Sequence, residues 1–345
     1  MASSVLTRRP MRSAAVLLLV VCTAAGGLYA QFKSTVPLVV APTTVTDSNG
    51  RYVDGLEEAD LVLYDNNVRQ VVHLDYDIYP ISVVVAVENG AAAQPVLDKL
   101  GNSGILFSQL VAGGAGQTAV ISFSDEIRQA QDFTDDPDLV TRALRRLRVK
   151  GSGARALDAI LRALQMLDQR PPNQRRIVLL VAESRDRGSS ASLADVVKAV
   201  QRQNALVYWL TYSTTFTPYT SRPKTVGDRK QEEERGKFPT EDAKPLPPDV
   251  GDMNLLAPFF ALAHLTRPNL ADLFSRATGA RTIGFLKKNG LEQAIQIIGD
   301  EVHRQYILSY QPLPGEPGEF RPIRVEVLNR PDLRAKTRAG YWSVP

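Results

Sequence analysis

The stretch SVVVAVENGAAAQ, residues 82–94, decides the fold of this chain. Its run of β-branched and small apolar residues stops at Glu88-Asn89-Gly90, which predicts a buried strand, a tight turn and a following helix. In open α/β sheets, ligands usually bind at the loops that follow the carboxyl ends of the strands. The turn at residues 88–90 is therefore the first candidate for a functional site.

The same alternation of apolar strands and helical segments continues beyond this turn. Strands are predicted at 118–123, 175–182, 205–212 and near 280–285, with helices at about 95–111, 136–148, 154–168, 189–203 and 289–304. Strands that alternate with helices of this length favour an α/β fold with a doubly wound, mostly parallel sheet. Continuous apolar strands fit a sheet that is covered on both faces.

The two ends of the chain have a different pattern. Residues 34–76 and 305–345 alternate apolar and polar residues in short runs separated by turn residues such as Asn49-Gly50, which indicates antiparallel strands. We expect the two end segments to form one β-rich module. The predicted organisation is a signal peptide at 1–30, a β segment at 31–78, an α/β domain at 79–304 with a flexible insertion at 213–252, and a C-terminal β segment at 305–345.

The first thirty residues have the pattern of an export signal. Arg8, Arg9 and Arg12 precede the apolar run SAAVLLLVVCTAAGGLYA, which ends in small residues and predicts cleavage after Ala30. The run is short for a membrane span, which needs about 20 apolar residues, so an uncleaved anchor is the alternative. The chain is thus expected to be secreted or periplasmic, and its only cysteine, Cys22, lies inside the signal.

No catalytic motif stands out in the chain. The three histidines, His73, His264 and His303, have no spacing that joins them, and the usual hydrolase signatures are missing. The alternative of a periplasmic hydrolase would need a carboxylate pair drawn from Glu88, Glu183 and Asp186. The sequence instead predicts a protein that is not an enzyme and needs no cofactor.

One helical segment is strongly basic. In LVTRALRRLRVK, residues 139–150, the apolar residues fall on one helical face and most of the arginines on the other. A solvated face is the simplest interpretation. A nucleic-acid partner is not expected, because the chain is exported, its formal charge is only +4, and this segment has no aromatic residue for base stacking.

The sequence resembles the von Willebrand factor A (vWFA) family, and in particular the secreted vWFA-related proteins of acidobacteria. The flanking segments carry the resemblance most clearly: VTDSNGRYVDGLEEADLVLYDNNVRQVV before the α/β region, and LADLFSRATGARTIGF, IGDEVHRQYILSYQP and FRPIRVEVLNRPDLRAKTRAGYW after it. The family implies a doubly wound sheet with a metal-ion-dependent adhesion site at its carboxyl edge.

The residues that match the family's metal ligands have changed. The first motif, Asp-x-Ser-x-Ser, falls on Val87, Asn89 and Ala91. The helix-start threonine falls on Ala154, and the third motif, Asp-Gly, falls on Glu183 and Ser184. Because a hard divalent cation needs several oxygen ligands, the resemblance implies a degenerate site that binds no metal.

The leading functional hypothesis is therefore an exported, non-catalytic scaffold that binds a protein partner in the envelope or extracellular space without a metal. The alternatives are the carboxylate-based hydrolase and a structural subunit of an envelope assembly, which would touch the membrane only through an uncleaved N-terminal helix. The candidate contact residues at the sheet edge are Glu88, Asn89, Ser152, Arg155, Glu183 and Arg185.

Overall fold

The computed structural model describes residues 38–75, 80–101, 103–110, 116–212, 269–285 and 290–343. The predicted signal peptide and the predicted insertion at 213–252 lie outside these residues, as does His264. The described residues belong to one compact unit, Leu38–Pro345.

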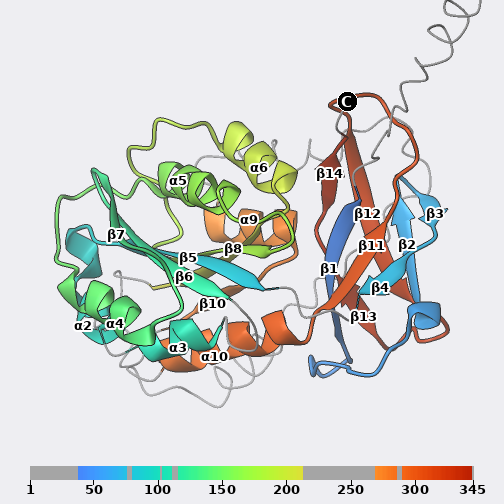
Figure 1. The fold of residues 1–345 in the computed structure, drawn as a ribbon, viewed down its shortest axis with the longest axis horizontal. Coiled ribbons are helices and arrows are strands. Elements are labelled where there is room, and N and C mark those ends of the chain that lie inside the picture. The colour runs from blue at the N-terminus through green and yellow to red at the C-terminus, as the bar shows by residue number, and fades with distance from the viewer. Residues whose placement is uncertain are drawn as a thin grey trace, which may run out of the picture. The chain divides into compact units, whose positions relative to one another are not determined.

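A six-stranded sheet forms the centre of the α/β region, as the sequence predicts (Figure 1). Its strand order is β10-β9-β8-β5-β6-β7, and every neighbouring pair is parallel except β6 and β7. The strands are β5 (Ile81–Glu88), β6 (Gln117–Phe123), β7 (Ile127–Thr134), β8 (Arg175–Ala182), β9 (Leu206–Thr211) and β10 (Thr282–Gly284).

Helices cover both faces of this sheet, because successive strand residues point to opposite sides. Val83 and Val85 face one layer of helices, whereas Val84 and Ala86 face the other. The first layer comprises α2 (Gln94–Leu100), α3 (Gly104–Gln109), α4 (Pro137–Arg146) and α10 (Gly290–His303). The second comprises α5 (Ala156–Asp168), α6 (Leu193–Arg202) and α9 (Leu270–Thr278).

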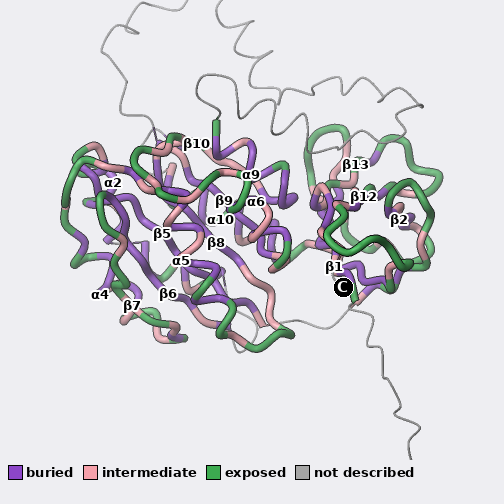
Figure 2. Tube along the Cα trace, turned by 90° about the horizontal axis from the view of Figure 1, so that it is seen from above, coloured by how far each residue is buried: buried purple, intermediate pink, exposed green. Residues whose placement is uncertain are grey.

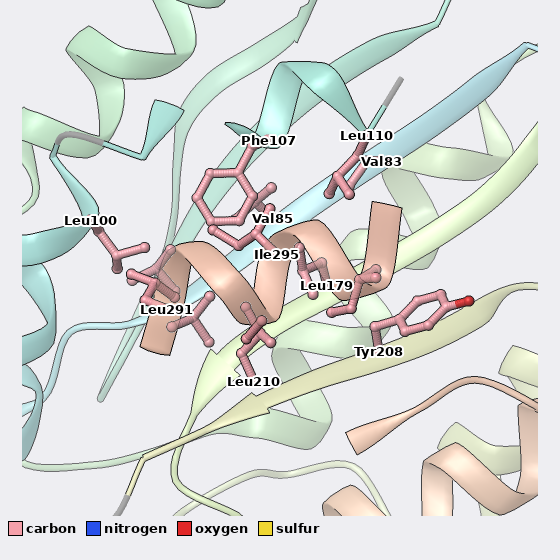
Figure 3. Close-up of a cluster of buried hydrophobic side chains, with 14 of the residues drawn as sticks. Val83, Val85, Leu100, Phe107, Leu110, Leu179, Tyr208, Leu210, Leu291 and Ile295 are labelled. Carbon is pink, nitrogen blue, oxygen red and sulfur yellow. The ribbon is translucent and has the colours of Figure 1, made fainter. Parts of the chain in front are cut away.

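The core of the first layer is a set of interlocking aliphatic and aromatic side chains (Figure 3). Phe107 of α3 and Ile295 of α10 lie over Val85, and all three are fully buried. Figure 2 shows the same concentration of buried residues along the central strands. Burial of this apolar surface is the main force that fixes the sheet and therefore the loops at its edges.

Segments from both ends of the chain pair with each other in two antiparallel four-stranded sheets. Their orders are β13-β1-β11-β4 and β14-β12-β2-β3. Both sheets contribute to one hydrophobic cluster, which includes Leu63, Leu308 and Val325. The strands are β1 (Val39–Thr46), β2 (Leu61–Asp65), β3 (Val68–Gln70), β4 (His73–Asp75), β11 (Tyr306–Tyr310), β12 (Phe320–Val327), β13 (Arg334–Lys336) and β14 (Gly340–Trp342).

Two local predictions were wrong. The helix expected at 95–111 is broken, because α2 ends at Leu100 and α3 begins at Gly104. Strand β7, at residues 127–134, was not predicted, and it makes the one antiparallel edge of the described central sheet. Its sequence IRQAQDFT carries few apolar residues because the strand lies at the edge and is mostly exposed.

Candidate functional site

The candidate site lies at the carboxyl ends of β5, β6 and β8, where the loops converge as the sequence predicts. The turn after β5 bonds to the loop before α5: Ala91 N–H donates to Gly151 O at 3.1 Å, and Lys150 N–H donates to Asn89 O at 2.8 Å. The loop before α5 also pairs with the loop after β8 through two hydrogen bonds between Ala154 and Arg187, at 3.0 and 2.8 Å. We call these joined segments, residues 88–91, 124–126, 147–155 and 183–191, the sheet-edge loops.

Gly90 lets the first two loops approach closely. A Cβ at this position would lie 2.8 Å from the backbone oxygen of Gly153, well inside van der Waals contact. The residue has an extended backbone, φ −67° and ψ 173°, so the reason for glycine here is space and not a left-handed conformation. Any larger residue would push the loop before α5 away from the β5 turn.

Glu88 ends strand β5 with its carboxylate fully buried. Oε2 accepts a hydrogen bond from Glu183 N–H at 2.8 Å, and Oε1 lies 3.4 Å from Nη2 of Arg187. Burial raises the pKa of Glu88 above its ordinary value, although these two donors oppose the shift. The neighbouring Tyr212 phenol also has a raised pKa, first because it is buried and then because the Glu88 carboxylate is close.

Arg187 bridges two carboxylates. While Nη2 approaches Glu88, Nη1 lies 3.1 Å from Oε2 of Glu183. The side chain of Arg187 is 44% exposed, whereas those of Glu88 and Glu183 are 0% and 13% exposed. One guanidinium therefore pairs with two acids that lie beneath it and faces solvent with its other side.

Asn89 connects the β5 turn to the end of α4. Its Nδ2 donates to Arg148 O at 3.0 Å, and its backbone N–H donates to Phe123 O at 2.9 Å. Oδ1 is buried and has no hydrogen-bond partner. The amide is therefore used mainly as a structural link, since a partner molecule would have to displace the loops to reach it.

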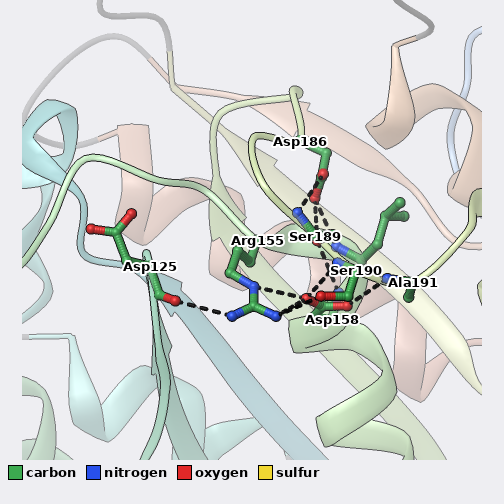
Figure 4. Close-up of polar contacts among 8 residues, drawn as sticks. Asp125, Arg155, Asp158, Asp186, Ser189, Ser190 and Ala191 are labelled. Atoms are coloured by element: carbon green, nitrogen blue, oxygen red, sulfur yellow. Dashed lines mark hydrogen bonds and ion pairs between the residues drawn. The ribbon is translucent and has the colours of Figure 1, made fainter.

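A second cluster forms around Asp158, in the first turn of α5 (Figure 4). Its carboxylate accepts the backbone N–H groups of Ser190 and Ala191, both at 2.9 Å, and pairs with Nη2 of Arg155 at 2.6 Å. Burial alone would raise the pKa of Asp158, but these donors outweigh it and hold the pKa below its usual value. Arg155 also donates to Asp125 O at 3.1 Å, so this cluster links three of the sheet-edge loops.

Asp125 and Asp186 are occupied in the same way. Asp125 accepts the N–H groups of Ser152 at 3.2 Å and Gly153 at 2.8 Å. Asp186 accepts from Leu157 N–H at 3.1 Å and from the Ser189 hydroxyl at 2.6 Å. These carboxylates serve as caps for loop backbone, and their oxygens are directed into the loops (Figure 4).

The residues at this edge do not fit a divalent cation. Val87 and Ala154 are buried and Ala91 is a methyl side chain, so three of the five family positions offer no side-chain oxygen. The two carboxylates at or next to the family's ligand positions, Glu88 and Glu183, are already bridged by Arg187. Across the described ranges, no group of three or more His, Cys, Asp or Glu side chains has the arrangement of a metal site.

The predicted contact residues differ in their access to solvent. Ser152 and Arg185 are exposed and Arg155 is partly exposed. Glu88 is completely buried and Asn89 is 6% exposed, so neither can touch a partner unless the loops rearrange. The hydrolase alternative requires an acid free to exchange a proton with substrate, but Glu88, Glu183 and Asp186 are all engaged within the protein.

The sequence alone did not single out Arg187 or Asp125. Each lies in a polar loop whose partners come from other loops, so only the strand order brings them together. One local signal was present in the sequence for Arg187, namely the glycine that follows it. In the structure Gly188 has φ +96°, a turn conformation that fixes the backbone beside Ala154.

Residues 91–185 match the family model described as the von Willebrand factor type A domain. No curated protein matches the chain. Among solved structures, the conserved hypothetical protein BatB from Bacteroides thetaiotaomicron is 14% identical with a TM-score of 0.41, over 65% of this chain and 98% of that one. A von Willebrand factor type A protein from Catenulispora acidiphila is 9% identical with a TM-score of 0.43, over 91% and 75%.

A third similar structure is an aerotolerance-related membrane protein from Bacteroides fragilis NCTC 9343. It is 14% identical with a TM-score of 0.39, over 64% of this chain and 99% of that one. In the part of the present chain that the structure describes, no helix combines the length and the apolar character needed to cross a membrane.

Proposed function

We propose that this chain is an exported, non-catalytic scaffold of the von Willebrand factor type A kind that binds a protein partner, a proposal supported by the match of residues 91–185 to that domain's family model. The partner lies in the envelope or the extracellular space, because the N-terminal sequence has the pattern of an export signal. Binding uses the sheet-edge loops.

The observation that carries this proposal is the way these loops are joined. Segments from four places in the sequence are bonded into one surface, through Asn89 to Lys150, Ala154 to Arg187, and Asp125 to Gly153. A surface that is already ordered loses little conformational entropy when a partner docks, which favours binding. Its carboxylates accept hydrogen bonds that hold the loops together, which supports a structural role for them in the proposed scaffold.

Within this surface the six candidate residues have two roles. Ser152, Arg155 and Arg185 offer side chains to the partner, since they are wholly or partly exposed. Glu88, Asn89 and Glu183 hold the loops in place from below. Arg187 supplies the positive charge between the acids, so the proposed binding needs no metal ion.

The test is capture of partners from an envelope extract by the immobilised protein, in chelator and in magnesium. We expect the same proteins to be retained in both buffers. Ser152→Trp places a large side chain on the sheet-edge loops and should abolish retention, whereas Ser48→Trp, at an exposed turn beside β1, should not. Retention that requires magnesium, or that survives Ser152→Trp unchanged, would contradict the proposal.

A further inference from the structure

We infer that the protein partner presents a carboxylate-rich surface, which is bound by arginines of α4, of the segment that follows it and of the loop after β8. We call Arg142, Arg146, Arg148 and Arg185 the arginine surface. The inference rests on the proposed function and adds the chemistry of the partner.

Near the sheet-edge loops, the carboxylates have partners within the protein, whereas several guanidinium groups do not. The carboxylates of the sheet-edge loops all accept hydrogen bonds from within the protein; they are Glu88, Asp125, Glu126, Glu183 and Asp186. In the described part of the chain, three exposed arginine side chains make no hydrogen bond or ion pair: Arg142, Arg146 and Arg185. Each of these carboxylates thus has a partner within the protein, whereas the three guanidinium groups have none among the described residues.

Arg148 is also without a carboxylate partner among the contacts of the described residues. Its Nη1 donates to the backbone oxygens of Arg145 and Leu147, at 2.7 and 2.8 Å, and these neutral acceptors hold the side chain without cancelling its charge. The segment 139–150 contains Arg142, Arg145, Arg146, Arg148 and Lys150 but no acidic residue. Lys150 is paired with Glu126 at 3.2 Å, but the charges of Arg142, Arg146 and Arg148 are not offset by a carboxylate among the described contacts.

Packing directs these arginines outward. Val140, Ala143 and Leu144 on the opposite face of α4 are buried in the core, so the helix cannot rotate to hide the cations. The negative end of the helix dipole favours cations in the last turn, which accounts for Arg146. It does not account for Arg142, which lies in the middle of α4, or for Arg185, which lies in a loop.

The arginine surface is continuous with the proposed binding surface. Asn89 Nδ2 donates to the backbone oxygen of Arg148, which fixes the end of α4 to the turn after β5. Arg185 lies two residues after Glu183, which follows β8 and whose N–H bonds to Glu88 at the end of the neighbouring strand β5. A partner seated on the sheet-edge loops would therefore meet these guanidinium groups.

Carboxylates on a protein suit this surface better than a membrane or a nucleic acid. A guanidinium group binds a carboxylate with two parallel hydrogen bonds, which gives direction as well as charge. Membrane insertion by α4 would need exposed apolar side chains, but its apolar residues are in the core. Stacking of bases would need aromatic residues, and residues 139–150 contain none.

The test uses two triple variants that remove the same charge. Arg142→Gln/Arg146→Gln/Arg185→Gln removes three cations of the arginine surface. Arg69→Gln/Arg202→Gln/Arg334→Gln removes three others that are also exposed and whose side chains make no hydrogen bond or ion pair in the described part of the chain. Each triple removes one cation from the last turn of a helix, Arg146 in α4 or Arg202 in α6, so both variants should lose the same small dipole interaction and unfold at closely similar temperatures by circular dichroism.

The probe is a fluorescent hexaglutamate peptide, with hexaglutamine as the neutral comparison, in a buffer of low ionic strength that contains chelator. We expect hexaglutamate to bind the wild-type protein and the control triple equally. The arginine-surface triple should bind about tenfold more weakly, as anisotropy would measure. Equal weakening in both triples, or no preference of the wild type for hexaglutamate over hexaglutamine, would overturn the inference.

Two further measurements separate the possible failures. Vesicles with anionic headgroups should bind no better than neutral ones, and a loss of anionic-vesicle binding in the arginine-surface triple without hexaglutamate binding would assign the surface to lipid instead. The arginine-surface triple should also lose the envelope proteins that the wild type captures. If it retains them all, the inference is wrong while the proposed function stands; if the wild type captures none, the proposed function itself fails.

Discussion

Nη2 of Arg187 lies 3.4 Å from Oε1 of Glu88, so a half-exposed cation closes over a fully buried acid. Arg187→Met should leave Glu88 with the Glu183 N–H as its main remaining donor and should lower the free energy of unfolding by about 1–2 kcal/mol. The loss stays below that of a fully buried ion pair, because solvent screens the arginine. Urea denaturation followed by circular dichroism measures it.

The double variant Glu88→Gln/Arg187→Met is the control for this prediction. With no buried charge left, it should be more stable than Arg187→Met alone, since the glutamine side-chain oxygen can still accept from Glu183 N–H. If the two substitutions are simply additive, Glu88 and Arg187 do not interact, and the description of Arg187 as the cation of this site is wrong.

Divalent cations should have little effect on the wild-type protein. Magnesium, calcium, manganese or chelator should each change the melting temperature by less than about 1 °C, since a ligand stabilises a fold only if it binds the native state. Arg187→Ala removes the guanidinium between Glu88 and Glu183 and leaves these two acids without their shared cation. In that variant manganese should raise the melting temperature, and a rise in the wild type would contradict the loss of the metal site.

The two acidic clusters should respond to pH in opposite directions. The pKa of Asp158 is lowered in the folded protein, so its stabilisation is present above the unfolded value near 3.8 and is lost as the pH falls through the folded pKa. The pKa of Glu88 is raised above 4.5, so its contribution is present below that value and is lost as the pH rises through the folded pKa.

Two neutral variants read these contributions separately. Asp158→Asn should lose about 2 kcal/mol at neutral pH and approach the wild type in acid, because the amide cannot accept both backbone donors and pair with Arg155. Glu88→Gln should gain relative to the wild type as the pH rises from acid to neutral. The unfolding free energies of the wild type and both variants, measured from acid to neutral pH, test these two assignments. Curves of unfolding free energy against pH that run parallel for wild type and variants would refute both.

The sequence was sufficient for the parallel strands of the central sheet, because these strands have an unambiguous apolar pattern, but not for the exposed antiparallel edge strand β7. The apolar run RRIVLLVA corresponds residue for residue to β8, Arg175–Ala182, since a strand buried on both faces tolerates few polar residues. The break between α2 and α3 was missed because it depends on tertiary packing. A Cβ at Gly104 would lie 2.5 Å from the Cα of Thr141 in α4, so the close approach of two helices decides where α3 begins.

The location of the site could be predicted from the sequence, but the hydrogen bonds and ion pairs within it could not. The convergence of residues 88–91, 151–155 and 183–187 follows from the parallel order of β5 and β8, which the pattern implies. That Arg187 would bridge Glu88 and Glu183 could not be predicted, because all three are polar loop or strand-end residues with several possible partners. Burial of Glu88 was also unexpected, since a glutamate at the end of a strand is usually solvated.

Gly90, in the turn that follows β5, should be sensitive to substitution. Gly90→Ala should lower the free energy of unfolding by about 1–2 kcal/mol, because the added methyl group would lie 2.8 Å from the backbone oxygen of Gly153. The strain should displace the loop before α5 and so weaken hexaglutamate binding as well. Gly55→Ala is the matched control: a Cβ there meets nothing within 4 Å, so its cost comes only from its φ of +80° and should leave peptide binding unchanged. A Gly90→Ala protein that binds the peptide like the wild type would show that the position of this loop does not matter for recognition.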